Sequence, residues 1–169
     1  QEPGLPFFDA GHALFQADLS VRTEAKRLTD EVVAQMKRID VLVNNAGLWI
    51  DHNPASTTFD AWASAWEKTI GTNLLGAANV AHGAAQVMMK QGGGRIINIG
   101  SVLGFLPMPY GALYAATKHA VEGYSESLDH EVRSFGIRVA VIEPWATKTS
   151  IEANSPQGDR PVAAYAQTL

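Results

Sequence analysis

The chain has 169 residues, of which 46% are hydrophobic and 18% are charged, so it can bury a sizeable core and is not a disordered protein. Its formal net charge of −4 argues against a dedicated binder of nucleic acid or anionic membranes, which would carry a basic surplus. The absence of cysteine excludes disulfides, a thiolate nucleophile and a cysteine-ligated metal. No apolar run reaches the ~18 residues of a membrane span and no signal peptide is visible, so we expect a cytoplasmic globular protein.

The N-terminal part of the chain predicts one strand and one helix. Residues 13–17 form a short apolar run, typical of a buried strand, that ends at Asp18. Ser20 is a suitable N-cap for a helix over about 21–38, in which apolar residues recur at steps of three and four. This strand and helix would be the first of an alternating series.

The rest of the chain continues the alternation. Strands are expected at 41–43, 95–100 and 137–142, and helices at about 59–90 and 111–135, the last one ended by Gly136. Such alternation predicts an α/β protein with a Rossmann-like, doubly wound parallel sheet. We expect helices on both faces, in a three-layer α/β/α arrangement, and a single domain over residues 1–169.

In open parallel sheets, ligands bind beyond the carboxyl ends of the strands. The residues that follow the expected strands are therefore candidate site residues: Asp18, Asn44–Gly47, Ser101 and Pro144–Thr149. The small residues of Asn44–Gly47 would let a flat ligand approach the backbone, and an Asn side chain there can bridge neighbouring strands. The five histidines show no metal-binding spacing, so no metal site is expected.

Tyr114 and Lys118 are the most informative pair. Four residues advance about 6 Å along a helix and return to nearly the same face, so the ammonium can lie beside the phenol. A positive charge at that distance would lower the pKa of Tyr114 and suit it to give or take a proton near neutral pH. Alone the spacing is a weak indication, because an ordinary helix with a packed tyrosine and an exposed lysine also has it.

Ser101 and Asn73 strengthen this interpretation. Ser101 follows the strand at 95–100, and its hydroxyl could hydrogen-bond a substrate carbonyl oxygen, although a helix cap or turn explains it equally well alone. Asn73 lies inside a helical stretch, where an amide usually faces solvent but can also mark a bent turn that holds a water.

These residues stand in the order and spacing of a known family. From about residue 12 to 150 the chain resembles the short-chain dehydrogenase/reductase family. The matching residues are Asp18-Leu19, Asn44-Asn45-Ala46-Gly47, Asn73, Ser101, the run 114–118 and Pro144. The resemblance implies an NAD(P)-dependent oxidoreductase that interconverts an alcohol and a ketone or aldehyde. It also implies a dimer or tetramer of identical subunits, with neither nucleic acid nor membrane as a partner.

The resemblance implies a role for each matched residue. Tyr114 would be the general acid/base, and Lys118 would lower its pKa and hydrogen-bond the nicotinamide ribose. Ser101 would position the substrate oxygen, and Asn73 would hold a water that links Lys118 to a proton relay. The other matches would contact the cofactor, NAD or NADP: Asp18 and Leu19 at the adenine, Asn44, Ala46 and Gly47 around the adenosine ribose, and Thr147 and Thr149 at the nicotinamide amide and phosphates.

Two features depart from the family's pattern. The phosphate-binding fingerprint Gly-x-Gly-x-x-Gly is absent, and the run 92–94 does not replace it because it precedes a strand instead of opening a helix. Trp145 stands where the family usually has glycine, and we expect its side chain to face the site. A catalytically silent nucleotide-binding or scaffold protein is therefore a second hypothesis, and an epimerase or dehydratase with the same Tyr/Lys pair is a third.

The strand order raises one more expectation. In the order 3-2-1-4-5-6, residues 13–17 would form the third strand and 41–43 the fourth, about 14 Å apart with two strands between them. Direct pairing of 13–17 with 41–43 would contradict this arrangement. We therefore expect these residues to be a piece of a longer polypeptide, in which a glycine loop precedes them.

Overall fold

A computed structural model describes residues 11–145 of the chain and contains one parallel sheet. The strands β1 (Val41–Asn44), β2 (Gly94–Ile99) and β3 (Ile137–Ile142) lie in the order β1-β2-β3. In the register, Asn44 of β1 lies beside Asn98 of β2, and Ile99 lies beside Ile142. The carboxyl ends of all three strands therefore meet at one edge of the sheet.

Helices connect the strands, as the alternating sequence pattern predicts. Their bounds are α1 (Arg22–Met36), α2 (Phe59–Ile70), α3 (Ala77–Gln91) and α4 (Ala112–Val132), with a π-helical turn at Gly71–Gly76 and 3₁₀ turns at Val102–Gly104 and Arg133–Phe135. Gly136 follows the last turn with a φ of 76°, a left-handed conformation that glycine adopts freely, so the predicted glycine at this helix end is confirmed.

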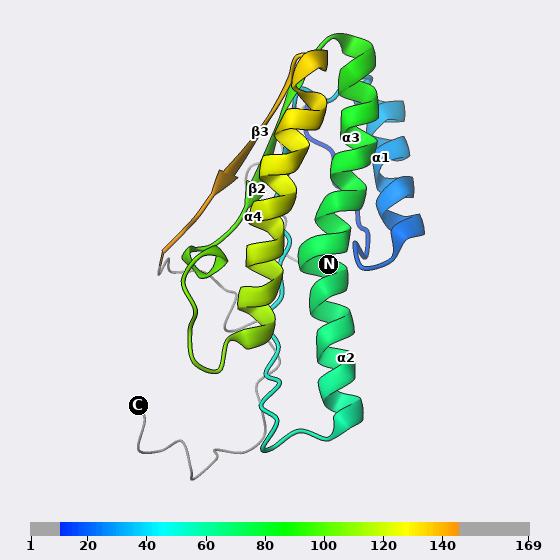
Figure 1. Cartoon of the computed structure of the whole chain (residues 1–169). Helices are drawn as coiled ribbons and strands as arrows, with labels where there is room; N and C mark the ends of the chain where they lie inside the picture. The colour runs from blue at the N-terminus through cyan, green and yellow to red at the C-terminus, as the bar shows by residue number, and fades with distance from the viewer. Residues whose placement is uncertain (1–10, 146–169) are drawn as a thin grey trace.

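Helices α3 and α4 cover one face of the sheet, and α1 packs beside α3 (Figure 1). The core between these layers is built from alanine and larger aliphatic side chains: Ala81, Ala84, Ala85, Met88, Ile96, Val132 and Ile137. On β1, the alternate residues Val41 and Val43 are exposed. The α/β class and the parallel sheet are thus confirmed. Within residues 11–145, the helical cover lies on one face of the sheet, so the expected second layer is not part of what the structure describes.

Residues 13–17 do not form the expected strand. They run as an irregular segment in which Leu14 is 83% exposed, and β1 pairs only with β2 among the described residues. An apolar run becomes a strand only where a neighbour satisfies its backbone hydrogen bonds, and residues 13–17 have no neighbouring strand in the described part of the chain. Direct pairing of residues 13–17 with 41–43, which would have contradicted the expected strand order, is not observed among the described residues.

The start of α1 also differs from the prediction. Val21 is the N-cap and offers no side-chain hydrogen bond. Ser20 instead donates its backbone N–H and its hydroxyl to the Asp18 carboxylate, at 2.9 and 2.6 Å. The turn before the helix is therefore closed by Asp18 and not by Ser20.

The helical stretch predicted over 59–90 is divided into two helices by the π-helical turn. Thr58 caps α2, its hydroxyl accepting the N–H of Ala61 at 3.2 Å. At Gly76, in the turn, an added Cβ would lie 2.9 Å from the Leu19 side chain, so only glycine allows this close approach. In the described part of the chain, no helix combines the length and apolar composition needed to cross a membrane.

Candidate active site

Tyr114 and Lys118 lie on α4 at the end nearest the carboxyl edge of the sheet. The Lys118 ammonium donates to the carbonyl oxygen of Ile99, the last residue of β2, at 2.7 Å. The same Nζ lies 5.4 Å from the centre of the Tyr114 ring. Lys118 is only 5% exposed, so the predicted adjacency of ammonium and phenol is confirmed in a largely buried setting.

Ser101 has the capping role that was one of its two sequence interpretations, and its role toward a substrate oxygen stays a prediction. It caps the short turn at Val102–Gly104, where its Oγ accepts the N–H of Leu103 at 3.2 Å. Its side chain also hydrogen-bonds the Tyr114 hydroxyl. The turn after β2 therefore fixes Ser101 in the position where it meets Tyr114.

The pKa values of the two α4 residues are set mainly by burial. Burial raises the pKa of Tyr114, and the hydrogen bond with Ser101 opposes this rise. Burial lowers the pKa of Lys118 to about 8, and the negative charge of Glu122 opposes that fall. The expectation that Tyr114 has a lowered pKa is not met in this structure, because burial of the phenol outweighs the other effects. A neutral phenol remains suited to donate a proton.

Asn73 is buried in the π-helical turn, with 2% of its surface exposed. Its Oδ1 accepts the N–H of Leu48 at 2.7 Å, and its Nδ2 donates to the Leu48 carbonyl at 3.0 Å. Nδ2 also lies 3.1 Å from Oγ1 of Thr117, the residue before Lys118. Of the two interpretations of this mid-helix amide, the solvent-facing one is wrong and the bent turn is confirmed, whereas the water that the turn would hold stays a prediction. The turn aims Asn73 at both the loop after β1 and the helix that carries Tyr114.

Asn44 bridges neighbouring strands, as predicted. Its Nδ2 donates to Oδ1 of Asn98 on β2 at 2.9 Å and to the Ala77 carbonyl at 3.1 Å. Asn98 in turn donates to Oγ of Ser125 on α4 at 2.8 Å. The sequence interpretation missed Asn98 and Ser125. The one indication in the sequence was Asn98 itself, an amide within an apolar strand. The hydrogen bonds from Asn44 through Asn98 to Ser125 fix α4 against the sheet.

The residues expected at the adenosine half of the cofactor lie apart from this cluster. Asp18 is exposed, and its hydrogen bonds with Ser20 hold the pKa of its carboxyl below the ordinary value. Leu19 packs against Gly76 of the π-helical turn. No described contact joins either residue to Tyr114 or Lys118.

Of the remaining predicted cofactor residues, the two in the loop after β1 are described by the structure and the two threonines are not. Ala46 is exposed in the loop after β1, and a Cβ added at Gly47 would lie 3.7 Å from Oδ1 of Asn73, so this loop passes directly over the π-helical turn. Thr147 and Thr149 lie outside the described residues.

Trp145 is 71% exposed, so it is not a core residue, in agreement with the sequence prediction. The carbonyl of the preceding Pro144 accepts the N–H of Val102 at 3.2 Å. This bond places the end of β3 beside the Ser101 turn. That the indole faces the site stays a prediction.

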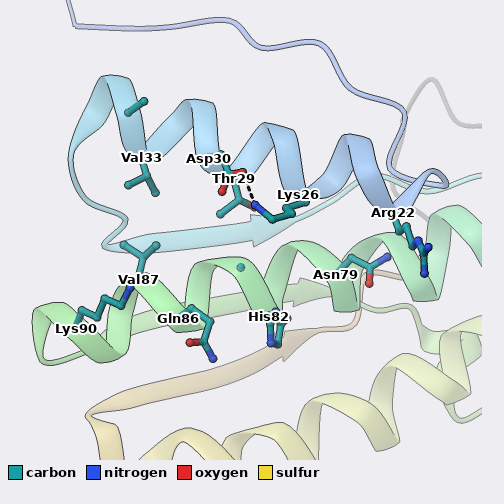
Figure 2. Close-up of a pocket in the computed structure, with 12 residues that line it drawn as sticks. Arg22, Lys26, Thr29, Asp30, Val33, Asn79, His82, Gln86, Val87 and Lys90 are labelled. Atoms are coloured by element: carbon teal, nitrogen blue, oxygen red, sulfur yellow. Dashed lines mark hydrogen bonds and ion pairs between the residues drawn. The ribbon is translucent and has the colours of Figure 1, made fainter.

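A groove in the described part of the structure lies elsewhere, between α1 and α3 (Figure 2). It has a volume of about 630 Å³ and its lining includes Arg22, Lys26, His82 and Lys90. Lys26 is exposed and ion-paired with Asp30 on the same helix. None of the predicted site residues lines this groove, so the cluster of Ser101, Tyr114 and Lys118 lies outside it.

The sequence of the chain is similar to those of a known family of proteins and its members. The family described as short chain dehydrogenase matches residues 9–160. An uncharacterised oxidoreductase of Schizosaccharomyces pombe is 34% identical over 143 residues, covering 85% of this chain and 59% of that protein. A 3-oxoacyl-(acyl-carrier-protein) reductase of Staphylococcus aureus is 38% identical over 129 residues, covering 76% of this chain and 51% of that protein.

A solved structure shows the same fold. The crystal structure of a gluconate 5-dehydrogenase from Burkholderia cenocepacia, in complex with NADP and tartrate, superposes with a TM-score of 0.72 at 32% identity. The match covers 80% of this chain and 51% of that one. The chain thus spans about half of the length of several proteins that it resembles.

Proposed function

Because the chain belongs to the short-chain dehydrogenase family, we propose that it carries the catalytic residues of an NAD(P)-dependent oxidoreductase that interconverts an alcohol and a ketone or aldehyde. The observation that carries the proposal is the cluster of Ser101, Tyr114 and Lys118. A hydroxyl, a phenol and a buried ammonium meet there at the carboxyl edge of the sheet. This set can hold a carbonyl oxygen and deliver a proton to it.

The Lys118 ammonium is suited to bind the ribose that links nicotinamide to the phosphates in NAD or NADP. An ammonium has three donors, and the Lys118 ammonium gives one of them to the Ile99 carbonyl. Its other donors suit ribose hydroxyls. NAD or NADP, when bound, supplies or accepts the hydride. The chain contains no Gly-x-Gly-x-x-Gly sequence that would hold the pyrophosphate, so our proposal for these residues covers the nicotinamide half.

In the direction of reduction, Tyr114 donates its phenolic proton to the substrate oxygen while Ser101 holds that oxygen by a hydrogen bond. The raised pKa keeps Tyr114 protonated and ready to donate. Lys118, as an ammonium, stabilises the phenolate that remains. In the direction of oxidation the same phenolate accepts the alcohol proton. Asn73 orders the loop and the helix on either side of this pair.

The relatives support this reaction class. The Staphylococcus aureus protein is named as a reductase of a 3-oxoacyl group, and the Burkholderia cenocepacia structure contains NADP. We propose NAD or NADP as the cofactor and a small alcohol or carbonyl compound as the substrate. The proposal extends to a cytoplasmic dimer or tetramer of identical subunits, packed through the helices near 73–90 and 111–135.

The test is turnover measured at the absorbance band of reduced nicotinamide, with a panel of ketones. We expect Tyr114→Phe to reduce kcat by about 10²- to 10⁴-fold with cofactor affinity changed only a few-fold, because the ring stays and only the proton donor is lost. The matched control is Tyr124→Phe, which is partly buried on the same helix and should retain activity. A Tyr114→Phe protein with more than about a tenth of the wild-type kcat would refute the role of Tyr114. Cofactor binding without turnover in the wild type would favour a catalytically silent nucleotide-binding protein.

A further inference from the structure

The loop between β1 and α2 contacts the catalytic helix at more than one point. Asn73 holds Leu48 by two hydrogen bonds. The Trp49 ring lies against the Tyr114 ring, with centres 5.1 Å apart and planes inclined at 42°. His52 then reaches the first turn of α4. The segment 48–52 therefore spans from the π-helical turn to the beginning of the helix that carries Tyr114.

His52 makes a defined pair of hydrogen bonds and is only 8% exposed. Its Nε2 lies 3.1 Å from the backbone nitrogen of Leu113, and its Nδ1 lies 3.1 Å from the Ile50 carbonyl. A backbone N–H can only donate, so Nε2 must be the acceptor, and a carbonyl can only accept, so Nδ1 must carry the hydrogen. The two partners thus select one neutral tautomer of the ring.

The bond to Leu113 satisfies a group that α4 leaves free. The first N–H groups of a helix have no partner within it, and Gly111, at the N-cap, has no side chain to accept one. Leu113 is buried, so its N–H would otherwise be deprived of water as well. Trp66 packs edge-on against the imidazole, with ring centres 6.3 Å apart and planes at 88°, and keeps the ring oriented.

We propose that His52 is a positioning residue for the reaction: it caps α4 from a distant loop and thereby fixes Tyr114, the residue that follows Leu113. The inference rests on the proposed role of Tyr114. With Trp49 against the phenol ring and His52 at the adjoining backbone, one short loop holds Tyr114 from two directions. Both ring nitrogens of His52 are taken up by backbone hydrogen bonds, so His52 acts on the reaction through the position of Tyr114.

Loss of the cap should affect the chemical step more than binding. A shift of about 1 Å in a reacting group can reduce a rate by about 10²-fold. We expect His52→Phe, which keeps a ring beside Trp66 but removes the acceptor, to lower kcat by about 10- to 100-fold with KM changed less than about threefold. His52→Gln returns an amide oxygen to the neighbourhood of Nε2 and should restore most of the loss. His82→Phe, on the exposed side of α3, is the matched control.

The position of α4 is followed independently of turnover. By NMR on the full chain, the Leu113 amide should lose hydrogen-exchange protection in His52→Phe and keep it in His52→Gln. The nuclear Overhauser contacts between the Trp49 and Tyr114 rings should weaken in parallel. These two measurements test the cap even if the wild-type protein turns over none of the ketones, an outcome that would count against the proposed function instead.

Two results would overturn the inference. Unchanged protection of Leu113 in His52→Phe would show that His52 does not cap the helix. Lost protection with unchanged ring contacts and unchanged kcat would show that the cap does not position Tyr114. If the Phe variant fails to fold, His52→Asn serves in its place, because its side chain is polar but too short to reach the Leu113 N–H from the same backbone position.

Discussion

Each end of α4 buries an ionisable side chain, but the two side chains differ in how many hydrogen-bonding partners they have. Near the C-terminal end, the Asp129 carboxylate accepts from Arg133 at 2.5 Å, Arg138 at 3.0 Å and the Val139 N–H at 2.8 Å. These donors hold the pKa of Asp129 well below its ordinary value. Near the other end, Lys118 has one backbone acceptor in the structure, and burial lowers its pKa to about 8.

The difference separates a structural charge from a chemical one. A buried charge with several hydrogen-bonding partners keeps its protonation state and stabilises the contact between elements, here between α4 and β3. A buried charge with few partners lies close to a change of protonation and has donors left for a ligand. The three predictions below test whether the two ends of α4 can be disrupted separately.

The largest effect is expected at Lys118. Lys118→Met should weaken cofactor binding by about 10- to 100-fold, because a hydrogen bond to a charged group contributes about 1.5–3 kcal/mol. It should also lower kcat by at least about 10²-fold, since the phenolate of Tyr114 loses its stabilising charge. The Tm should move by less than about 5 °C, because the variant also removes a poorly compensated buried cation. Lys90→Met, exposed on α3, is the control, and unchanged cofactor affinity in Lys118→Met would contradict the ribose contact.

At Asp129 the loss should appear in stability and not in chemistry. Asp129→Asn should lower the Tm by several degrees at neutral pH while kcat per folded molecule stays the same. The folded-state pKa lies below the ordinary value of 3.8, so the ionised carboxylate stabilises the fold above about pH 4 and loses this contribution as the pH falls further. Thermal melts of both proteins across this range should therefore converge at acid pH. A constant difference in Tm would contradict this assignment.

The smallest effect is expected at Glu122, one turn beyond Lys118. Its charge raises the pKa of Lys118, so Glu122→Gln should let Lys118 lose its proton at lower pH. The alkaline fall in kcat/KM should move in the same direction. Interactions between partly exposed charges contribute about 0.2–1 kcal/mol, so activity at pH 8 should fall by less than about fivefold. Glu126→Gln, exposed on the same helix, should leave the profile in place, and a shift there of equal size would refute a specific effect of Glu122.

Local pattern was sufficient to predict most of α4 and its site. The helix expected over 111–135 is observed at 112–132 with its following 3₁₀ turn, and the four-residue spacing of Tyr114 and Lys118 does bring them together. Ser101 was found because parallel strands end at one edge, a rule that needs only the order of strands and helices.

Other features depend on contacts that a linear sequence does not contain. The raised pKa of Tyr114 follows from burial, which is decided by tertiary packing. His52 gives no sign in the sequence that its partner is an amide at the beginning of α4. The prediction of a strand at residues 13–17 was wrong because a strand needs a neighbouring strand to hydrogen-bond with. Helix α4, by contrast, forms its backbone hydrogen bonds within itself.

The π-helical turn at Gly71–Gly76 has a consequence for how the chain can change in length. A π-turn holds one residue more than an α-turn, so it behaves as a single-residue insertion in an otherwise regular helix. Deleting one residue there would let α2 and α3 continue as one helix, but the side chains before and after would rotate by about 100° relative to each other. Asn73 would then turn away from Leu48 and Thr117. The number of residues between Ile70 and Ala77 is therefore constrained as strictly as their identity, and an alignment that closes a gap in this turn would assign the wrong residue to the position of Asn73.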